Sequence, residues 1–225
     1  MRVSDPAPLR GSTPRRDVTI LTDHFGLYGT LAVPTNAVGV VVFAHGSGSS
    51  RLSPRNIQVA QALNDARLAT LLFDLLTEEE AADRRNVFDI PLLATRVVAA
   101  VEWLDRQADV RHLPVGLFGA STGAAAALWA AAELGGSVGA VVSRGGRPDL
   151  AGARLEHVEA PTLLIVGELD QTVVELNRAS LAQLRSPAAL RLVPDATHLF
   201  EEPGALAQVA VLAADWFVRH LVRPR

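Results

Sequence analysis

Residues 114–134, PVGLFGASTGAAAALWAAAEL, decide the fold of this chain. The apolar run that ends at Phe118 predicts a buried strand, and the alanine-rich run that ends before Gly135 predicts a helix. Between them stands GASTG, residues 119–123, which is a G-x-S-x-G sequence. In the order strand, sharp turn, helix, this motif predicts a strained turn that exposes the serine hydroxyl, so Ser121 is a candidate nucleophile. The alternative is a tight turn in which Ser121 only caps the following helix.

Short apolar runs alternate with longer helical patterns on both sides of this segment. The runs from residue 39 onward are nearly continuous, which is typical of parallel strands buried on both faces, and the first two predict an antiparallel start. Together they predict a three-layer α/β sandwich with right-handed crossovers. The expected strands cover residues 17–22, 28–34, 39–45, 68–74, 114–121, 138–144, 161–168 and 190–194, and the expected helices cover 54–67, 91–107, 121–134, 172–184 and 203–221.

Composition narrows the class of protein. The 225 residues contain no cysteine, which excludes disulfides, cysteine zinc sites and a thiol nucleophile. A net charge of −3 gives no argument for nucleic acid or an anionic membrane as a partner. No apolar stretch approaches the roughly 20 residues that span a bilayer. We expect a soluble cytoplasmic protein with a loose leader over residues 1–16 and one domain over 17–225; its oligomeric state cannot be read from the sequence.

The serine needs a base, and the base needs a group that orients it. In folds that carry this turn, an acid and then a histidine follow the serine along the chain. Asp170 comes just after the strand expected over residues 161–168, and His198 lies in the loop after the last strand. We therefore predict Ser121, His198 and Asp170 as a catalytic triad. Alternatives for the acid are Asp195, Glu168 and Asp149.

The loop HGSGSSR, residues 45–51, follows the third strand and allows several interpretations. A dinucleotide site with Asp74 as the ribose ligand is disfavoured, because the third glycine position holds Arg51. A metal site is disfavoured too, because His45 has no second histidine or carboxylate at a spacing suitable for a metal ligand. An oxyanion hole fits better: it needs two backbone N–H donors, for which we predict Thr122 and Ser47. His45 then has a structural role, fixing the loop by hydrogen bonds.

Four arginines follow strands at the expected site. Arg51 and Arg55 come after the third strand, and Arg144 and Arg147 after the sixth. A guanidinium pairs well with a carboxylate, so Arg144, together with Arg51, is a candidate for binding an anionic group of the substrate. The alternative is that these arginines form ion pairs with nearby acids or face water.

The motifs FAHGSGS, GASTG, GELD and ATHLF, in that order, resemble the α/β-hydrolase superfamily, and the compact size resembles its dienelactone-hydrolase-like branch. The resemblance implies a mostly parallel eight-stranded sheet without a cap domain, a hydrolytic triad, and small ester or lactone substrates. Dienelactone hydrolases use a cysteine nucleophile where this chain has Ser121, so general carboxylic ester hydrolysis is the expected activity.

No cofactor or metal is expected for ester hydrolysis through a serine acyl-enzyme. A perhydrolase or an acyltransferase would use the same triad. Two hypotheses of other classes are a non-catalytic scaffold that binds a small molecule and a nicotinamide-dependent oxidoreductase.

Overall fold

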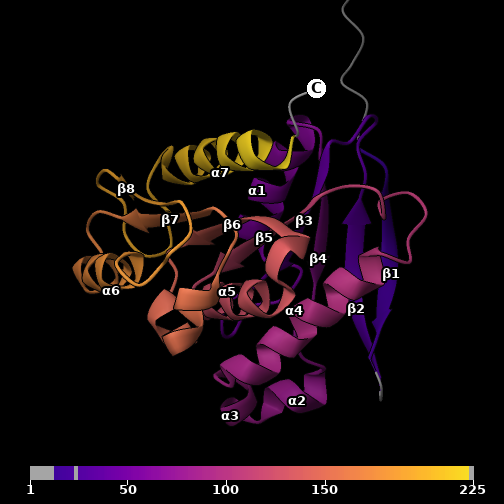
Figure 1. Ribbon diagram of the computed structural model, residues 1–225, viewed down its shortest axis with the longest axis horizontal. Helices are drawn as coiled ribbons and strands as arrows, with labels where there is room; N and C mark the ends of the chain where they lie inside the picture. The colour runs from indigo at the N-terminus through magenta and orange to yellow at the C-terminus, as the bar shows by residue number, and fades with distance from the viewer. Residues whose placement is uncertain (1–12, 23–24, 223–225) are drawn as a thin grey trace, which may run out of the picture.

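The computed structural model describes residues 13–22 and 25–222 (Figure 1). All eight predicted strands form one sheet, in the order β1-β2-β4-β3-β5-β6-β7-β8. The pairs β1–β2 and β2–β4 are antiparallel, and all other neighbours are parallel, which confirms the predicted mostly parallel sheet. The strands are β1 (Arg15–Leu21), β2 (Gly26–Ala32), β3 (Gly39–Ala44), β4 (Leu68–Phe73), β5 (Val115–Ala120), β6 (Val138–Arg144), β7 (Thr162–Gly167) and β8 (Ala188–Val193).

The chain joins the sheet earlier than expected. Strand β1 begins at Arg15, inside the segment predicted as a leader, because Arg15 and Arg16 pair with Ala32 and Leu31 of β2. Residues 1–12 of that predicted leader lie outside the described residues.

Helices cover both faces of the sheet (Figure 1). Helices α1 (Pro54–Asp65) and α7 (Ala205–Leu221) pack on one face, and α4 (Ile90–Leu104), α5 (Thr122–Leu134) and α6 (Gln171–Leu181) on the other. The predicted cap of α1 is present, since the Ser53 hydroxyl accepts a hydrogen bond from the Asn56 amide and Pro54 follows it. These layers are the predicted α/β sandwich.

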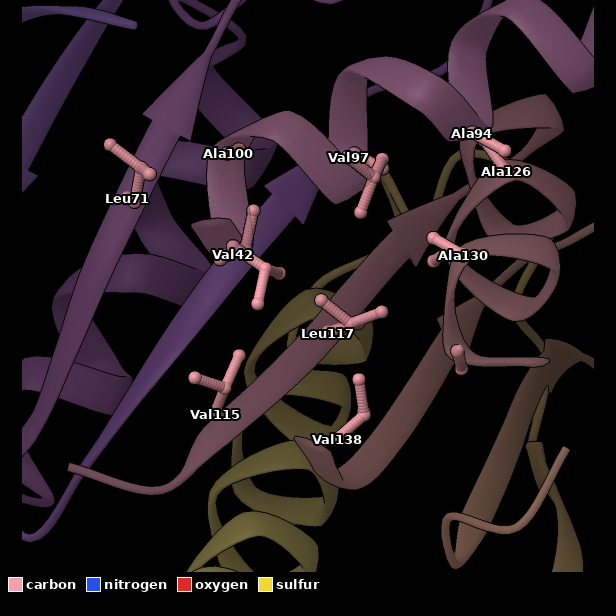
Figure 2. Close-up of a cluster of buried hydrophobic side chains, with 14 of the residues drawn as sticks. Val42, Leu71, Ala94, Val97, Ala100, Val115, Leu117, Ala126, Ala130 and Val138 are labelled. Carbon is pink, nitrogen blue, oxygen red and sulfur yellow. The ribbon is translucent and has the colours of Figure 1, made fainter. Parts of the chain in front are cut away.

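The larger part of the core lies between the sheet and helices α4 and α5. Val97 of α4 and Leu117 of β5 are fully buried there, and Ala94 and Ala126 lie at the contact of the two helices (Figure 2). Nine residues of α5 are buried, six of them alanines, so that this helix follows β5 closely. The close packing of α5 fixes the turn before it, which contains Ser121.

Short helices form in two segments for which the sequence predicted neither a helix nor a strand. Helices α2 (Glu78–Ala82) and α3 (Arg84–Val87) follow β4, and the 3-10 segment η2 (Pro148–His157) follows β6. Thr77 and Glu80 form a capping box that starts α2. A second 3-10 turn, η1 (Gly135–Ser137), precedes β6. None of these segments is large enough for a cap domain, and no helix in the described part of the chain has the length and hydropathy to cross a membrane.

Candidate active site

Ser121 lies in a strained turn between β5 and α5. Its backbone adopts φ 51° and ψ −123°, a conformation that non-glycine residues rarely take. A Cβ on Gly119 would lie 2.3 Å from Cα of Ala124, and one on Gly123 would lie 2.3 Å from the carbonyl oxygen of Ala44. Only glycine fits at these two positions, as the motif requires. The Ser121 side chain makes no capping hydrogen bond, which disfavours the alternative of a mere helix cap.

Asp170 and His198 meet at the carboxyl ends of β7 and β8. Nδ1 of His198 lies 2.7 Å from Oδ2 of Asp170, and the other carboxylate oxygen accepts a 3.4 Å hydrogen bond from the amide of Val173 in α6. Because a carboxylate only accepts, Nδ1 of His198 must donate, and Nε2 of the neutral ring remains free to accept a proton.

His198 lies beside the turn that holds Ser121. The Ser121 amide donates to the carbonyl of Arg144 at 3.2 Å. A Cβ on the next residue, Gly145, would lie 3.7 Å from Cε1 of His198. No hydrogen bond joins the Ser121 hydroxyl to His198 in the described structure, and such bonds commonly tighten only when substrate binds.

The other candidate acids have different surroundings. Asp195 has φ 55° and lies in the turn after β8, where it shapes the chain's approach to His198. Asp149 forms a paired contact with Arg147, with its two oxygens 2.8 and 2.9 Å from that guanidinium. Glu168 is exposed at the end of β7 and makes no side-chain hydrogen bond within the described residues. Among these acids, Asp170 is the one that contacts His198.

His45 fixes the loop after β3, as its predicted structural role requires. Its Nε2 accepts a hydrogen bond from the Leu75 amide at 3.0 Å, and its Nδ1 therefore donates to the Gly46 carbonyl at 3.0 Å. Burial lowers the pKa of His45 below its ordinary value of 6.5, against the opposing effects of the Gly46 carbonyl and Asp74. The neutral imidazole thus ties this loop to the end of β4.

The predicted oxyanion donors make a contact that the sequence did not indicate. The Ser47 amide donates to Oγ1 of Thr122 at 2.9 Å, so this N–H is already engaged by a side chain. Thr122 is only 6% exposed, and its hydroxyl proton has no acceptor among residues 13–22 and 25–222. A Cβ on Gly46 would lie 3.0 Å from Cβ of Ser121, so the loop passes directly against the turn.

The arginines near the site differ in burial and in whether a carboxylate neutralises their charge. Nη1 of Arg51 lies 2.6 Å from Asp74, whose other oxygen accepts the Arg51 amide, and Arg55 pairs with Glu201 at 3.2 Å. Arg144 is only 7% exposed and pairs with no carboxylate in the described part of the chain. Its nearest polar contact is a long one, 3.5 Å from Nη2 to Oδ1 of Asn56, and its Nε has no partner. Burial, followed by repulsion from Arg55, lowers the pKa of Arg144 to about 10.

Comparison with known proteins agrees with the fold. A family model described as "Alpha/beta hydrolase domain" matches residues 37–209. The chain belongs to this family. It is 53% identical to a dienelactone hydrolase from Anabaena variabilis, covering 94% of this chain and all of that one, with a TM-score of 0.92. Est1E from Butyrivibrio proteoclasticus shares the fold at a TM-score of 0.78 and 16% identity over 92% of this chain and 99% of that one.

Two curated relatives from Mycobacterium tuberculosis bear the name "Putative phosphoribosyl transferase". Each is 57% identical over 98% of this chain. The α/β-hydrolase chain spans about half the length of these relatives, 49% in each case.

Sequence reasoning missed three features of this α/β-hydrolase site. The first is the hydroxyl of Thr122, considered only for its amide, and the second is the ion pair between Arg51 and Asp74. The third is Glu202, which accepts from the amide and hydroxyl of Thr197 and so holds the loop of His198. These hydrogen bonds lower the pKa of Glu202, the Thr197 hydroxyl most of all. None of these three contacts follows from a sequence motif.

Proposed function

We propose that the protein is a serine hydrolase of carboxylic esters, with Ser121 as nucleophile, His198 as base and Asp170 as the residue that orients the base. The observation that carries the proposal is the 2.7 Å contact between Asp170 and His198. It lies beside Ser121, which has a positive φ and whose hydroxyl makes no hydrogen bond to cap α5. Membership of the α/β-hydrolase family and 53% identity to a dienelactone hydrolase support it.

The proposed reaction proceeds through an acyl-enzyme. Oγ of Ser121 attacks the ester carbonyl while Nε2 of His198 takes its proton. The tetrahedral intermediate collapses, His198 passes this proton to the leaving oxygen, and the alcohol departs. Water then attacks the acyl carbon and gives a proton to His198, which returns it to Ser121 as the acid leaves. Asp170 keeps Nδ1 protonated and stabilises the imidazolium that forms in both halves.

We propose that the oxyanion receives hydrogen bonds from the amide and the hydroxyl of Thr122, and that Ser47 contributes by holding this hydroxyl. The amide of Thr122 begins α5 and lies next to the nucleophile, as this type of site requires. The Ser47 amide donates to Oγ1 of Thr122, and this hydrogen bond positions and polarises the Thr122 hydroxyl. The proton of that hydroxyl is then free to turn toward the oxyanion. In this arrangement the hydroxyl donates to the oxyanion beside the Thr122 amide, and the Ser47 amide acts through the hydroxyl that it holds.

Arg144 is proposed to bind an anionic group of the substrate. A buried guanidinium without a carboxylate partner is unfavourable unless a ligand supplies the counter-charge. Arg144 is the last residue of β6, which lies on the same side of β5 as β7 and β8, and this favours an anion on the alcohol part of the ester. Arg51 is not included, because Asp74 already neutralises its charge.

The name of the mycobacterial relatives suggests phosphoribosyl transfer, which we assign to the half of those proteins that this chain does not cover. The match to this chain spans 49% of each relative, and the family model for a hydrolase accounts for residues 37–209. Perhydrolysis and acyl transfer would use the same triad, with peroxide or an alcohol in place of water.

The proposal is tested with p-nitrophenyl acetate. Wild-type protein should release p-nitrophenol, and Ser121→Ala should retain less than about one part in a thousand of kcat. Ser137→Ala, the same change at an exposed position before β6, should retain full activity. Adding hydrogen peroxide or an alcohol then reveals whether either competes with water for the acyl-enzyme.

A further inference from the structure

A pocket of about 400 Å³ lies on the side of the sheet where β3 and β4 end. The loop after β3 forms one wall through Gly46 and Ser47, and helices α2 and α3 close the opposite side. Apolar side chains dominate the lining: Leu27, Leu75, Leu76, Ala81, Val87 and Leu93. A cavity of this size accepts a small organic group.

The polar groups of this pocket are largely paired. Arg51 and Asp74 neutralise each other at 2.6 Å, and both ring nitrogens of His45 are engaged by backbone groups. Thr77 uses its hydroxyl to cap α2. Glu78 also lines the pocket, and its exposed carboxylate has no ion pair in the described part of the chain. An anionic group entering the pocket would lose its hydration, gain no free counter-ion and face Glu78, so the lining disfavours an anion.

The strand order places this pocket and His198 on opposite sides of the nucleophile. From Ser121 at the end of β5, the sheet runs through β3 and β4 to the pocket in one direction. In the other direction it runs through β6 to β7 and β8, after which Asp170 and His198 follow. A general acid must lie beside the leaving oxygen that it protonates, so the alcohol of an ester bound at Ser121 lies on the β7–β8 side.

We infer that the pocket beside β3 and β4 binds the acyl group of the substrate, and that this group is uncharged and apolar. The pocket adjoins the turn of Ser121 through the loop after β3. Gly46 and Ser47 line the pocket, a Cβ on Gly46 would lie 3.0 Å from Cβ of Ser121, and the Ser47 amide contacts Thr122. The inference rests on the proposed esterase function and specifies its substrates as esters of apolar acids.

The test uses two exposed neighbours on α2. Ala81 lines the pocket and Ala82 does not, so Ala81→Trp fills the pocket while Ala82→Trp is its matched control. The substrates are p-nitrophenyl acetate, butyrate, hexanoate and benzoate, together with the p-nitrophenyl monoester of succinic acid. A second series keeps the acetyl group and varies the alcohol.

In wild type, kcat/KM should rise from acetate to the larger apolar acyl groups and fall for the succinate monoester. Ala81→Trp should lower kcat/KM for hexanoate and benzoate about tenfold or more, with acetate and the alcohol series changed less than about threefold. Ala82→Trp should match wild type throughout.

Three outcomes would overturn the inference. Equal losses in Ala81→Trp on acetate and hexanoate, or losses that follow the alcohol instead of the acyl group, would show that the pocket does not hold the acyl chain. A wild-type preference for the succinate monoester would show that the acyl group is charged. Failure of wild type to hydrolyse any ester in a Ser121-dependent way would instead remove the proposed function itself.

Discussion

The imidazole Nδ1 of His198 lies 2.7 Å from Oδ2 of Asp170, although 28 positions of sequence separate the two residues. The contact exists because β7 and β8 are parallel neighbours, so that the loops after them leave the sheet side by side. Hydrogen bonds from the amides of Glu168 and Leu169 to the carbonyls of Val193 and Ala196 join the two loops. The pair is therefore held by the backbone and does not depend on a substrate for its geometry.

Replacing the acid that contacts His198 should slow the reaction strongly. Asp170→Asn would favour the imidazole tautomer that places a proton toward Ser121, and we expect kcat to fall by roughly 10³–10⁴. The matched control is Asp195→Asn, since asparagine tolerates the positive φ of that turn. Steady-state kinetics on p-nitrophenyl acetate measure both; a larger loss in the control would make Asp195 the acid.

Removing the hydroxyl of Thr122 tests its proposed role as an oxyanion donor. Thr122→Val keeps the shape of the side chain but loses the proton, and we expect kcat to fall about 10- to 100-fold with KM little changed. Thr122→Ser should restore most of the activity. If Thr122→Val is as active as wild type or faster, the hydroxyl only competes for the Ser47 amide, which the loss of the side chain would release.

The buried, unpaired charge of Arg144 should lower the free energy of unfolding when no ligand is bound. Arg144→Met removes a buried charge that has no ion-pair partner within the described residues, and we expect the free energy of unfolding to rise by about 1 kcal/mol or more. Arg147→Met, which breaks the contact with Asp149 at the surface, should change it by less than about 1 kcal/mol. Urea denaturation without added anions gives both values, and a marked destabilisation by Arg144→Met would make the guanidinium structural.

The same variant tests the anionic-substrate proposal. Arg144→Met should lose about 1.5–3 kcal/mol in kcat/KM on an acetate ester with a carboxylate-bearing alcohol, relative to a neutral ester. Equal losses on the two esters would argue against an anion at Arg144.

The buried His45 should make stability depend on pH. Because burial lowers the pKa of His45 in the folded protein, its contribution is complete above the ordinary value of 6.5 and is lost as pH falls toward the folded value. His45→Gln keeps a donor and an acceptor but does not titrate, so its urea midpoint should fall less than that of wild type between pH 7.5 and about 5. His112→Gln, at an exposed position, should follow wild type. Identical pH profiles for wild type and His45→Gln would contradict the assignment.

The sheet could be predicted from the sequence because its signals are local. Composition and periodicity are enough to predict the strand in the apolar run 162–167 and the helix in the alanine-rich α5. The glycines at 119 and 123 belong to a short motif, and the close contacts around its turn require them. Strand β1 was placed two residues late because Arg15 and Arg16 have polar side chains, and only their pairing with β2 makes them part of a strand.

The contacts of individual side chains could not be predicted in the same way. The choice of Asp74 as the partner of Arg51, 23 positions away, follows from β3 and β4 being neighbours, which no local pattern encodes. The burial of Arg144 depends on α1 and on Phe200, whose ring lies 5.9 Å from the guanidinium. Helices α2 and α3 were missed because each has five residues or fewer, too short for a periodic signal.

The central claim is that Ser121 is the nucleophile of an esterase, and covalent labelling tests it most directly. Wild-type protein is incubated with a fluorophosphonate, and its intact mass and labelled peptide are measured by mass spectrometry. We predict a single adduct on Ser121, no adduct in Ser121→Ala, and much slower labelling in His198→Ala, because the serine then lacks its base. An adduct on another residue, or labelling of Ser121→Ala at the wild-type rate, would contradict this claim.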